Sequence, residues 1–125
     1  MTPVLVDSDV LIEVFRGRDP QILDRWAALA TPETAVLYSP VTVAEVWHGA
    51  RPSEISATRA LFSALVCAPI DQAVGQQAGE YLAHYARSHN LELGDALIAA
   101  TASLQPARLW TRNRKHYPMP ELEFY

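Results

Sequence analysis

The chain has 125 residues, of which 50% are hydrophobic, and a formal net charge of −4 at pH 7. A chain of this length supports one compact domain with its own apolar core, so two ordinary domains are excluded. The acidic balance disfavours a general nucleic-acid coat protein, and no apolar run reaches the roughly 18 residues that a membrane-spanning helix needs. We therefore expect a single domain over residues 1–125 with no membrane partner. Because no basic leader precedes the first apolar stretch, we expect a cytoplasmic protein.

Short apolar strands and helices alternate along the first half of the chain. Residues 4–6 predict a buried strand, and the amphipathic helix that follows it ends at Gly17. A second helix over about residues 22–30 leads to a strand at 35–38. The pair Ser39-Pro40 is typical of the cap and the first residue of another helix. The unit of strand followed by helix therefore repeats.

The second half of the chain continues this pattern. The predicted elements are helices over about residues 54–65, 74–86 and from 95 onward, and strands at 66–68, 109–111 and 122–124. Cys67 is the one cysteine of the sequence, and its apolar neighbours predict a buried, unreactive thiol that suits a reducing cytosol. Asn90 follows the most regular helical pattern and is expected to turn the chain there.

This order of elements predicts an α/β fold with three layers, in which a mostly parallel sheet is flanked by helices. In such sheets ligands bind beyond the carboxyl ends of the strands. Asp7 follows the first predicted strand, residues 39–45 follow the second, and residues 112–113 follow the strand at 109–111. We therefore expect these three segments to meet at one edge of the sheet.

The two acids at the end of the first strand have both a structural and a functional interpretation. Asp7 is well placed to cap the following helix, which is worth about 1 kcal/mol. Ser8 is an equally good cap, and in that case neither carboxylate is needed for capping. Asp9 would then remain unexplained, and a pair of acids at this position indicates a cation site.

Two later acids also have structural alternatives. Thr42 and Glu45 have the spacing of a capping box, in which Glu45 would bond back to the Thr42 backbone. The start signal at Ser39 argues against this, because it places Glu45 in the second turn of the helix, among apolar neighbours. Asp95 is a candidate cap for the helix that follows it. The functional interpretation therefore depends on whether the acids come together.

The predicted fold offers a reason for Asp7, Glu45 and Asp95 to converge. Three carboxylates at close range repel one another, and a hard cation such as Mg²⁺ or Mn²⁺ relieves that repulsion through oxygen ligands. Such cations activate water for attack on phosphorus and stabilise the leaving oxygen. The acids therefore predict phosphoryl chemistry.

Four motifs in this order resemble those of VapC-type PIN-domain toxins. They are Val-Asp-Ser-Asp-Val-Leu-Ile, Thr-Val-Ala-Glu-Val-Trp-His-Gly-Ala, Gly-Asp-Ala-Leu-Ile-Ala-Ala-Thr-Ala and Leu-Trp-Thr-Arg-Asn-Arg-Lys-His-Tyr. Each motif alone is unspecific, but the four together cover almost the whole chain. The resemblance implies a PIN-like fold, a Mg²⁺-dependent endoribonuclease for which Mn²⁺ can substitute, a homodimer, and a cognate antitoxin that blocks the acidic pocket.

Carried over by position, the resemblance implies that Asp7, Glu45 and Asp95 are catalytic acids that hold the metal. Asn113 matches a polar position that helps to shape the site, and we count it among the catalytic residues. Relatives place a fourth acid either at the position of Asn113 or near His116, and neither position is acidic in this chain. We therefore expect one metal to bind well and a second to bind weakly or only together with RNA.

The motif near the C-terminus supplies further candidates. Thr111 and Arg112 are expected to assist at the site, and Asp9 is the candidate to replace the absent fourth acid. Arg112, Arg114 and Lys115 are expected to contact RNA phosphates. The alternative interpretation of this basic run is a solvated, charged loop.

Two other classes of function also fit parts of the sequence. The Asp7-x-Asp9 pattern also resembles the nucleophile motif of haloacid-dehalogenase-type phosphatases, but that chemistry needs a Lys before the later acid. The one Lys of this chain, Lys115, comes after Asp95. A non-catalytic PIN-like or receiver-like binding module is the other alternative, and the three intact acids argue against it. A metal-dependent endoribonuclease toxin remains the favoured hypothesis.

Overall fold

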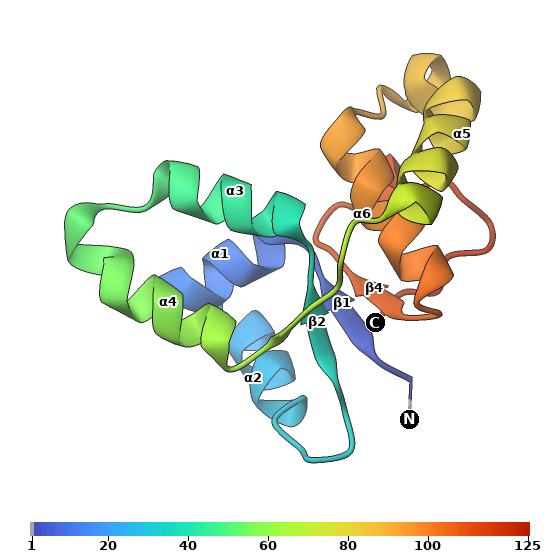
Figure 1. Cartoon of the computed structure of the whole chain (residues 1–125). Helices are drawn as coiled ribbons and strands as arrows, with labels where there is room; N and C mark the ends of the chain where they lie inside the picture. Colours follow the sequence, from blue (N-terminus) through green and yellow to red (C-terminus); the bar gives the residue numbers. More distant parts are fainter. Residues whose placement is uncertain (1) are drawn as a thin grey trace.

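The computed structural model describes residues 2–125 and has four short strands at its centre, with helices on both sides (Figure 1). The strands are β1 (Val4–Val6), β2 (Val36–Tyr38), β3 (Val66–Cys67) and β4 (Arg108–Trp110). The helices are α1 (Ser8–Arg16), α2 (Pro20–Ala28), α3 (Pro40–Gly49), α4 (Ile55–Ser63), α5 (Gln72–His89) and α6 (Leu93–Leu104), with short 3-10 turns at Pro52–Glu54 and Arg114–His116. This arrangement confirms the predicted three-layer α/β fold.

The sheet is parallel throughout and has the strand order β3-β2-β1-β4. Leu5 of β1 lies opposite Leu37 of β2 and Leu109 of β4, so the three strands end at nearly the same level. The Asp7 amide, immediately beyond β1, donates to the carbonyl of Trp110 at 2.9 Å. The segments that follow these strands therefore meet at one edge of the sheet, as the sequence predicted.

Alternating side chains of the sheet divide the apolar core into two parts. Leu5 and Leu109 face the layer formed by α5 and α6, where small residues such as Ala99 allow close packing. Val6 and Trp110 face the opposite layer, which includes α1, α2 and α4. Figure 1 shows these two groups of helices on either side of the strands. Among residues 2–125, no helix is long and apolar enough to cross a bilayer.

Local capping explains where several helices begin and end. Ser39 caps α3 by accepting a hydrogen bond from the Val41 amide at 3.1 Å, as its place before a proline predicted. Gly17 ends α1 with a φ of 66°, and Asn90 ends α5 with a φ of 52°. Both residue types tolerate this left-handed conformation better than others do. The chain turns therefore lie where the sequence indicated.

Two expectations about the edges of the sheet are wrong. Residues 122–124 do not form a strand, because only Phe124 makes a bridge, which pairs with Leu109. Cys67 is exposed rather than buried. It lies in β3, a two-residue edge strand with a neighbour on one side only, so its apolar sequence neighbours do not enclose the thiol.

Candidate active site

A cavity of about 290 Å³ lies at the carboxyl edge of the sheet. Its lining includes all four residues predicted as catalytic, together with the predicted auxiliary Asp9; the complete set is Asp7, Ser8, Asp9, Glu45, Glu92, Asp95, Asn113, His116 and Tyr117. Four different segments supply these side chains. The carboxylates that the sequence predicted therefore line one cavity. Thr111 does not line it but donates a hydrogen bond to Asp7.

Asp7 is buried at the base of the cavity and receives three hydrogen bonds. Its Oδ1 accepts from the Ser8 amide at 2.7 Å, which makes Asp7 the N-cap of α1. Its Oδ2 accepts from Thr111 Oγ1 at 2.9 Å and from the Tyr117 hydroxyl at 2.8 Å. Asp7, not Ser8, is therefore the cap, and the capping and functional interpretations apply to the same side chain.

Ser8 connects α1 to the acid on α3. Its hydroxyl donates to Glu45 Oε1 at 2.9 Å and lies 3.0 Å from Thr42 Oγ1. A hydroxyl has one proton and a carboxylate only accepts, so Ser8 accepts in turn from Thr42. The capping box between Thr42 and Glu45 is therefore wrong, because α3 begins at Pro40 and Glu45 turns toward Ser8.

Asp95 lies in the first turn of α6, which begins at Leu93, earlier than the sequence suggested. Its Oδ2 accepts from the Glu92 amide at 3.3 Å. Burial raises the pKa of Asp95, the hydrogen bond from Glu92 opposes that shift, and the nearby negative charge of Asp7 adds to it. Asp95 therefore helps to cap α6 from inside the helix while it faces the acidic cavity.

Asp9 is a further acid of the cavity, and its side chain is partly removed from water. Its Oδ2 accepts from the backbone N–H of Arg112 at 3.1 Å, whereas its Oδ1 is buried and has no hydrogen-bond partner among residues 2–125. Burial, together with the charge of Asp7, raises the pKa of Asp9 to about 6. An unpartnered carboxylate oxygen in an acidic cavity is a position at which a cation would be stabilised.

The C-terminal motif reaches the cavity through three of its residues. Asn113 lines the cavity, and its backbone N–H donates to Thr111 Oγ1 at 3.1 Å. His116 has a buried Nδ1 that no group in the described part of the chain contacts by a hydrogen bond. Tyr117, which the sequence analysis missed, follows a 3-10 turn and points its hydroxyl at Asp7. Burial and the charge of Asp7 raise its pKa, so the hydroxyl keeps its proton and donates.

The basic side chains of the C-terminal motif make different contacts. Arg112 Nη1 lies 3.4 Å from Glu13 Oε2, a buried carboxylate that Arg18 contacts at the same distance. Arg114 donates to the backbone carbonyl of Tyr125 at 3.1 Å, and Lys115 is exposed. Neither Glu13 nor its pairing with Arg112 had a signal in the sequence, since the two are far apart along the chain.

The chemical groups that line the cavity suit a hard divalent cation. They present carboxylate and amide oxygens, and within residues 2–125 the buried Asp9 Oδ1 and His116 Nδ1 have no hydrogen-bond partner. Within residues 2–125, no three His, Cys, Asp or Glu side chains are grouped tightly enough to hold an ion as they stand. The oxygens of Asp7, Glu45 and Asp95 named above each contact a protein donor instead.

The chain is similar to known proteins over nearly its whole length. The PIN domain family profile matches residues 4–122. Ribonuclease VapC10 of Mycobacterium tuberculosis is 38% identical over 94% of this chain and 88% of that protein. Ribonuclease VapC19 of the same organism is 32% identical over 95% of this chain and 96% of that protein.

Two solved structures extend the comparison. A toxin–antitoxin complex from Klebsiella pneumoniae contains a chain with 30% identity and a TM-score of 0.74, covering 95% of this chain and 94% of that one. The DNA-bound VapBC complex of Salmonella typhimurium has a TM-score of 0.83 at 18% identity, covering 100% of this chain and 98% of that one. The second likeness shows the fold alone.

Proposed function

The chain belongs to the PIN-domain family, and we propose that it is the toxin of a toxin–antitoxin pair, an endoribonuclease that hydrolyses RNA phosphodiester bonds. One observation carries this proposal: Asp7, Glu45 and Asp95 line a single cavity at the carboxyl edge of a parallel sheet. Relatives named as ribonucleases, aligned over nearly the whole chain, support the reaction class.

In this proposal, Asp7, Glu45 and Asp95 hold Mg²⁺, and Mn²⁺ can substitute for it. The bound ion would supply Lewis acidity to the phosphoryl oxygen and lower the pKa of the attacking water. Ser8 orients the Glu45 carboxylate, Thr111 orients that of Asp7, and Asn113 offers its amide to the substrate. Asp9, beside Asp7, supplies the additional negative charge that a second, weaker cation would need.

The reaction class predicts both metal dependence and the chemistry of the product ends. The purified chain should cleave single-stranded RNA in the presence of Mg²⁺ or Mn²⁺. This cleavage should stop when EDTA is added. Because water attacks phosphorus, the ends should be linear phosphates and hydroxyls, which mass spectrometry of a short RNA can identify. A 2′,3′-cyclic phosphate would contradict the proposal, because it requires attack by the neighbouring 2′-hydroxyl instead.

Arg112, Arg114 and Lys115 are proposed to contact RNA phosphates, with Arg112 also acting as an auxiliary group beside Asp9. Replacing Arg112 or Lys115 by Ala should weaken RNA binding and reduce the slope of log K against log salt by about 1. Fluorescence anisotropy of a labelled single-stranded RNA between 50 and 200 mM salt, about the range over which phosphate contacts change affinity strongly, measures the slope.

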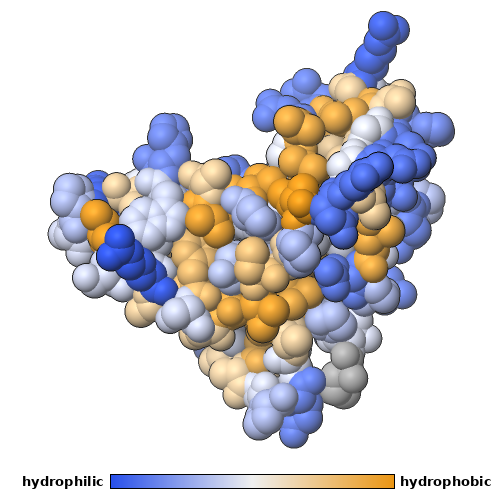
Figure 2. Space-filling model, in the orientation of Figure 1, coloured by the Kyte–Doolittle hydropathy of each residue, from blue (hydrophilic) through white to orange (hydrophobic). Residues whose placement is uncertain are grey.

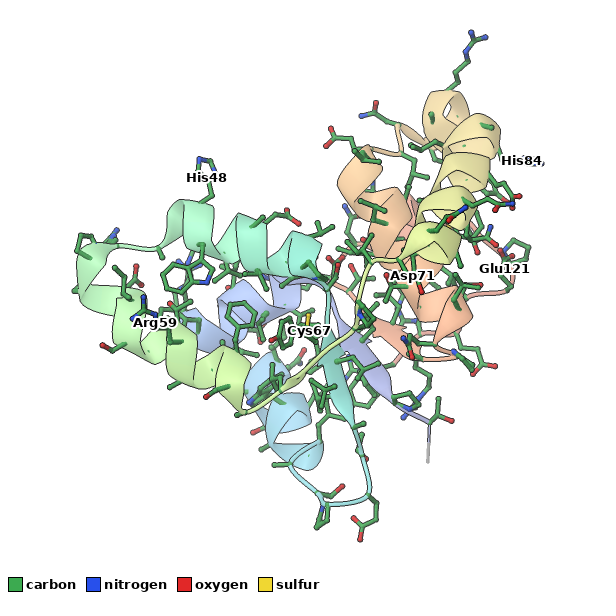
Figure 3. All side chains as sticks on the ribbon, in the orientation of Figure 1. His48, Arg59, Cys67, Asp71, His84 and Glu121 are labelled. Atoms are coloured by element: carbon green, nitrogen blue, oxygen red, sulfur yellow. The ribbon has the colours of Figure 1, made fainter. Side chains whose placement is uncertain are left out.

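The matched control is Arg59→Ala. Arg59 lies on α4 (Figure 3), with its guanidinium 5.8 Å from the centre of the Trp47 ring, and it does not line the cavity. Its removal should leave the salt slope unchanged. If wild type, Arg112→Ala and Lys115→Ala show the same slope of log K against log salt, the solvated-loop interpretation of these residues would be correct.

Two protein partners belong to the proposal. A cognate antitoxin would block the acidic cavity, and the solved relative from Klebsiella pneumoniae is itself described as a toxin–antitoxin complex. A second copy of the chain would form a homodimer, for which Val66 and Ile70, 55% and 37% exposed, offer apolar surface. Their segment crosses the face in Figure 2, where apolar side chains gather. We propose that residues 1–125 act as one domain, in the cytoplasm.

A further inference from the structure

The hydrogen bonds to Asp7 are distributed unequally between its two oxygens. Oδ2 accepts two, from Thr111 Oγ1 and from the Tyr117 hydroxyl, whereas Oδ1 accepts one, from the Ser8 amide. An ionised carboxylate offers about four acceptor positions, two on each oxygen. Protein donors therefore fill Oδ2 and leave one acceptor position, on Oδ1.

Tyr117 is held firmly enough to maintain this arrangement. Its side chain is 4% exposed and packs with Met119 and Leu122 in the core beneath α5 and α6. Its amide donates to the Arg114 carbonyl at 3.0 Å, which fixes the backbone at the end of the 3-10 turn. Because both the ring and the backbone are constrained, the hydroxyl approaches Asp7 from a fixed direction.

From this geometry we propose that Tyr117 is a positioning residue that restricts Asp7 to one ligating oxygen and thereby favours Mg²⁺ over Ca²⁺. Mg²⁺ requires near-ideal octahedral geometry and suits a carboxylate that binds through one oxygen. Ca²⁺ has a larger and more flexible shell and readily takes both oxygens of a carboxylate. The inference rests on the proposed metal site and adds a residue that selects the ion held there.

The test is calorimetric titration of the RNA-free protein with Mg²⁺ and, separately, with Ca²⁺. In Tyr117→Phe, Oδ2 loses one of its two donors, so Mg²⁺ affinity should fall about tenfold, as is typical when a group supporting a ligand is removed. Ca²⁺ affinity should stay the same or rise, because Asp7 can then offer both oxygens. The preference for Mg²⁺ over Ca²⁺ should therefore decrease by about tenfold or more.

Tyr81→Phe is the matched control. Tyr81 is also almost fully buried, at 5% exposure, and its hydroxyl donates to a carboxylate, Glu121 Oε1, at 2.6 Å. Glu121 lies beside α5 and is not part of the acidic cavity (Figure 3). Loss of the Tyr81 hydroxyl should leave the affinities for Mg²⁺ and for Ca²⁺ unchanged. Thermal unfolding of both variants shows whether each remains folded at the titration temperature.

Thr111→Val provides a second test if Tyr117→Phe does not fold. Thr111 is the other donor to Oδ2, so its removal should shift the preference in the same direction. An unchanged Mg²⁺ to Ca²⁺ ratio, or an equal loss for both ions, would overturn the inference. If wild type and Asp7→Asn bind Mg²⁺ equally, the proposed metal site itself fails, a result distinct from failure of selectivity.

Discussion

Asp7→Asn should abolish RNA cleavage, reducing the rate by about 10³-fold or more, while the protein remains folded. Loss of a ligand charge removes several kcal/mol of transition-state stabilisation, and each 1.4 kcal/mol or so is a factor of ten in rate. The fold is preserved because Asn caps a helix as well as Asp does, so the bond from the Ser8 amide remains. The Thr111 and Tyr117 hydroxyls can accept from the new amide group.

The measurement pairs initial cleavage rates with urea unfolding of the same preparations. Asp71→Asn is the matched control, because Asp71 caps α5 by accepting from the Val74 amide at 3.0 Å and lies outside the cavity (Figure 3). It should retain wild-type activity and stability. Loss of activity together with loss of folding in Asp7→Asn would favour a purely capping role, and retained activity would remove Asp7 from the site.

Trp110→Ala should give the largest loss of stability, about 4 kcal/mol, through the cavity left in the core. Trp110 is 2% exposed and ends β4. Its ring centre lies 6.3 Å from that of Trp26 and 5.1 Å from that of Tyr125, and Arg25 lies 5.1 Å above it. Since small domains are stable by only about 5–15 kcal/mol, the variant should be close to unfolding.

Urea unfolding monitored by circular dichroism tests this expectation, with Trp47→Ala as the comparison. Trp47 is half-buried on α3, and its ring is in contact with the exposed Arg59. Its replacement should therefore cost clearly less than that of Trp110. Equal losses of stability for the two variants would contradict the assignment of Trp110 to the part of the core between the sheet and helices α1, α2 and α4.

Local signals in the sequence predicted the order of the elements and the place of Asp7. Ser39 before a proline and Asn90 after a regular helical pattern each identify a helix end through backbone preferences that act within a few residues. Parallel strands then align their carboxyl ends, so Asp7 and the segment after β4 had to meet.

Contacts between distant segments could not be predicted in the same way. Glu45 fits a capping box with Thr42 by spacing alone, yet it bonds to Ser8, which lies 37 positions away. Tyr117 reaches Asp7 across 110 positions, and an aromatic residue near the C-terminus suggests core packing rather than a bond to a carboxylate. These partners follow from the packing of the layers, which the pattern of each element does not encode.

We propose that Asp7, Glu45 and Asp95 together form a metal-dependent ribonuclease site. Sequencing the 5′ ends of one RNA pool after incubation with wild type or Asp95→Asn, each with Mg²⁺ and with EDTA, tests it most directly. A defined set of new ends should appear with wild type and Mg²⁺, and none of these ends should appear in the other three reactions. The same ends produced by Asp95→Asn, or by wild type in EDTA, would contradict it.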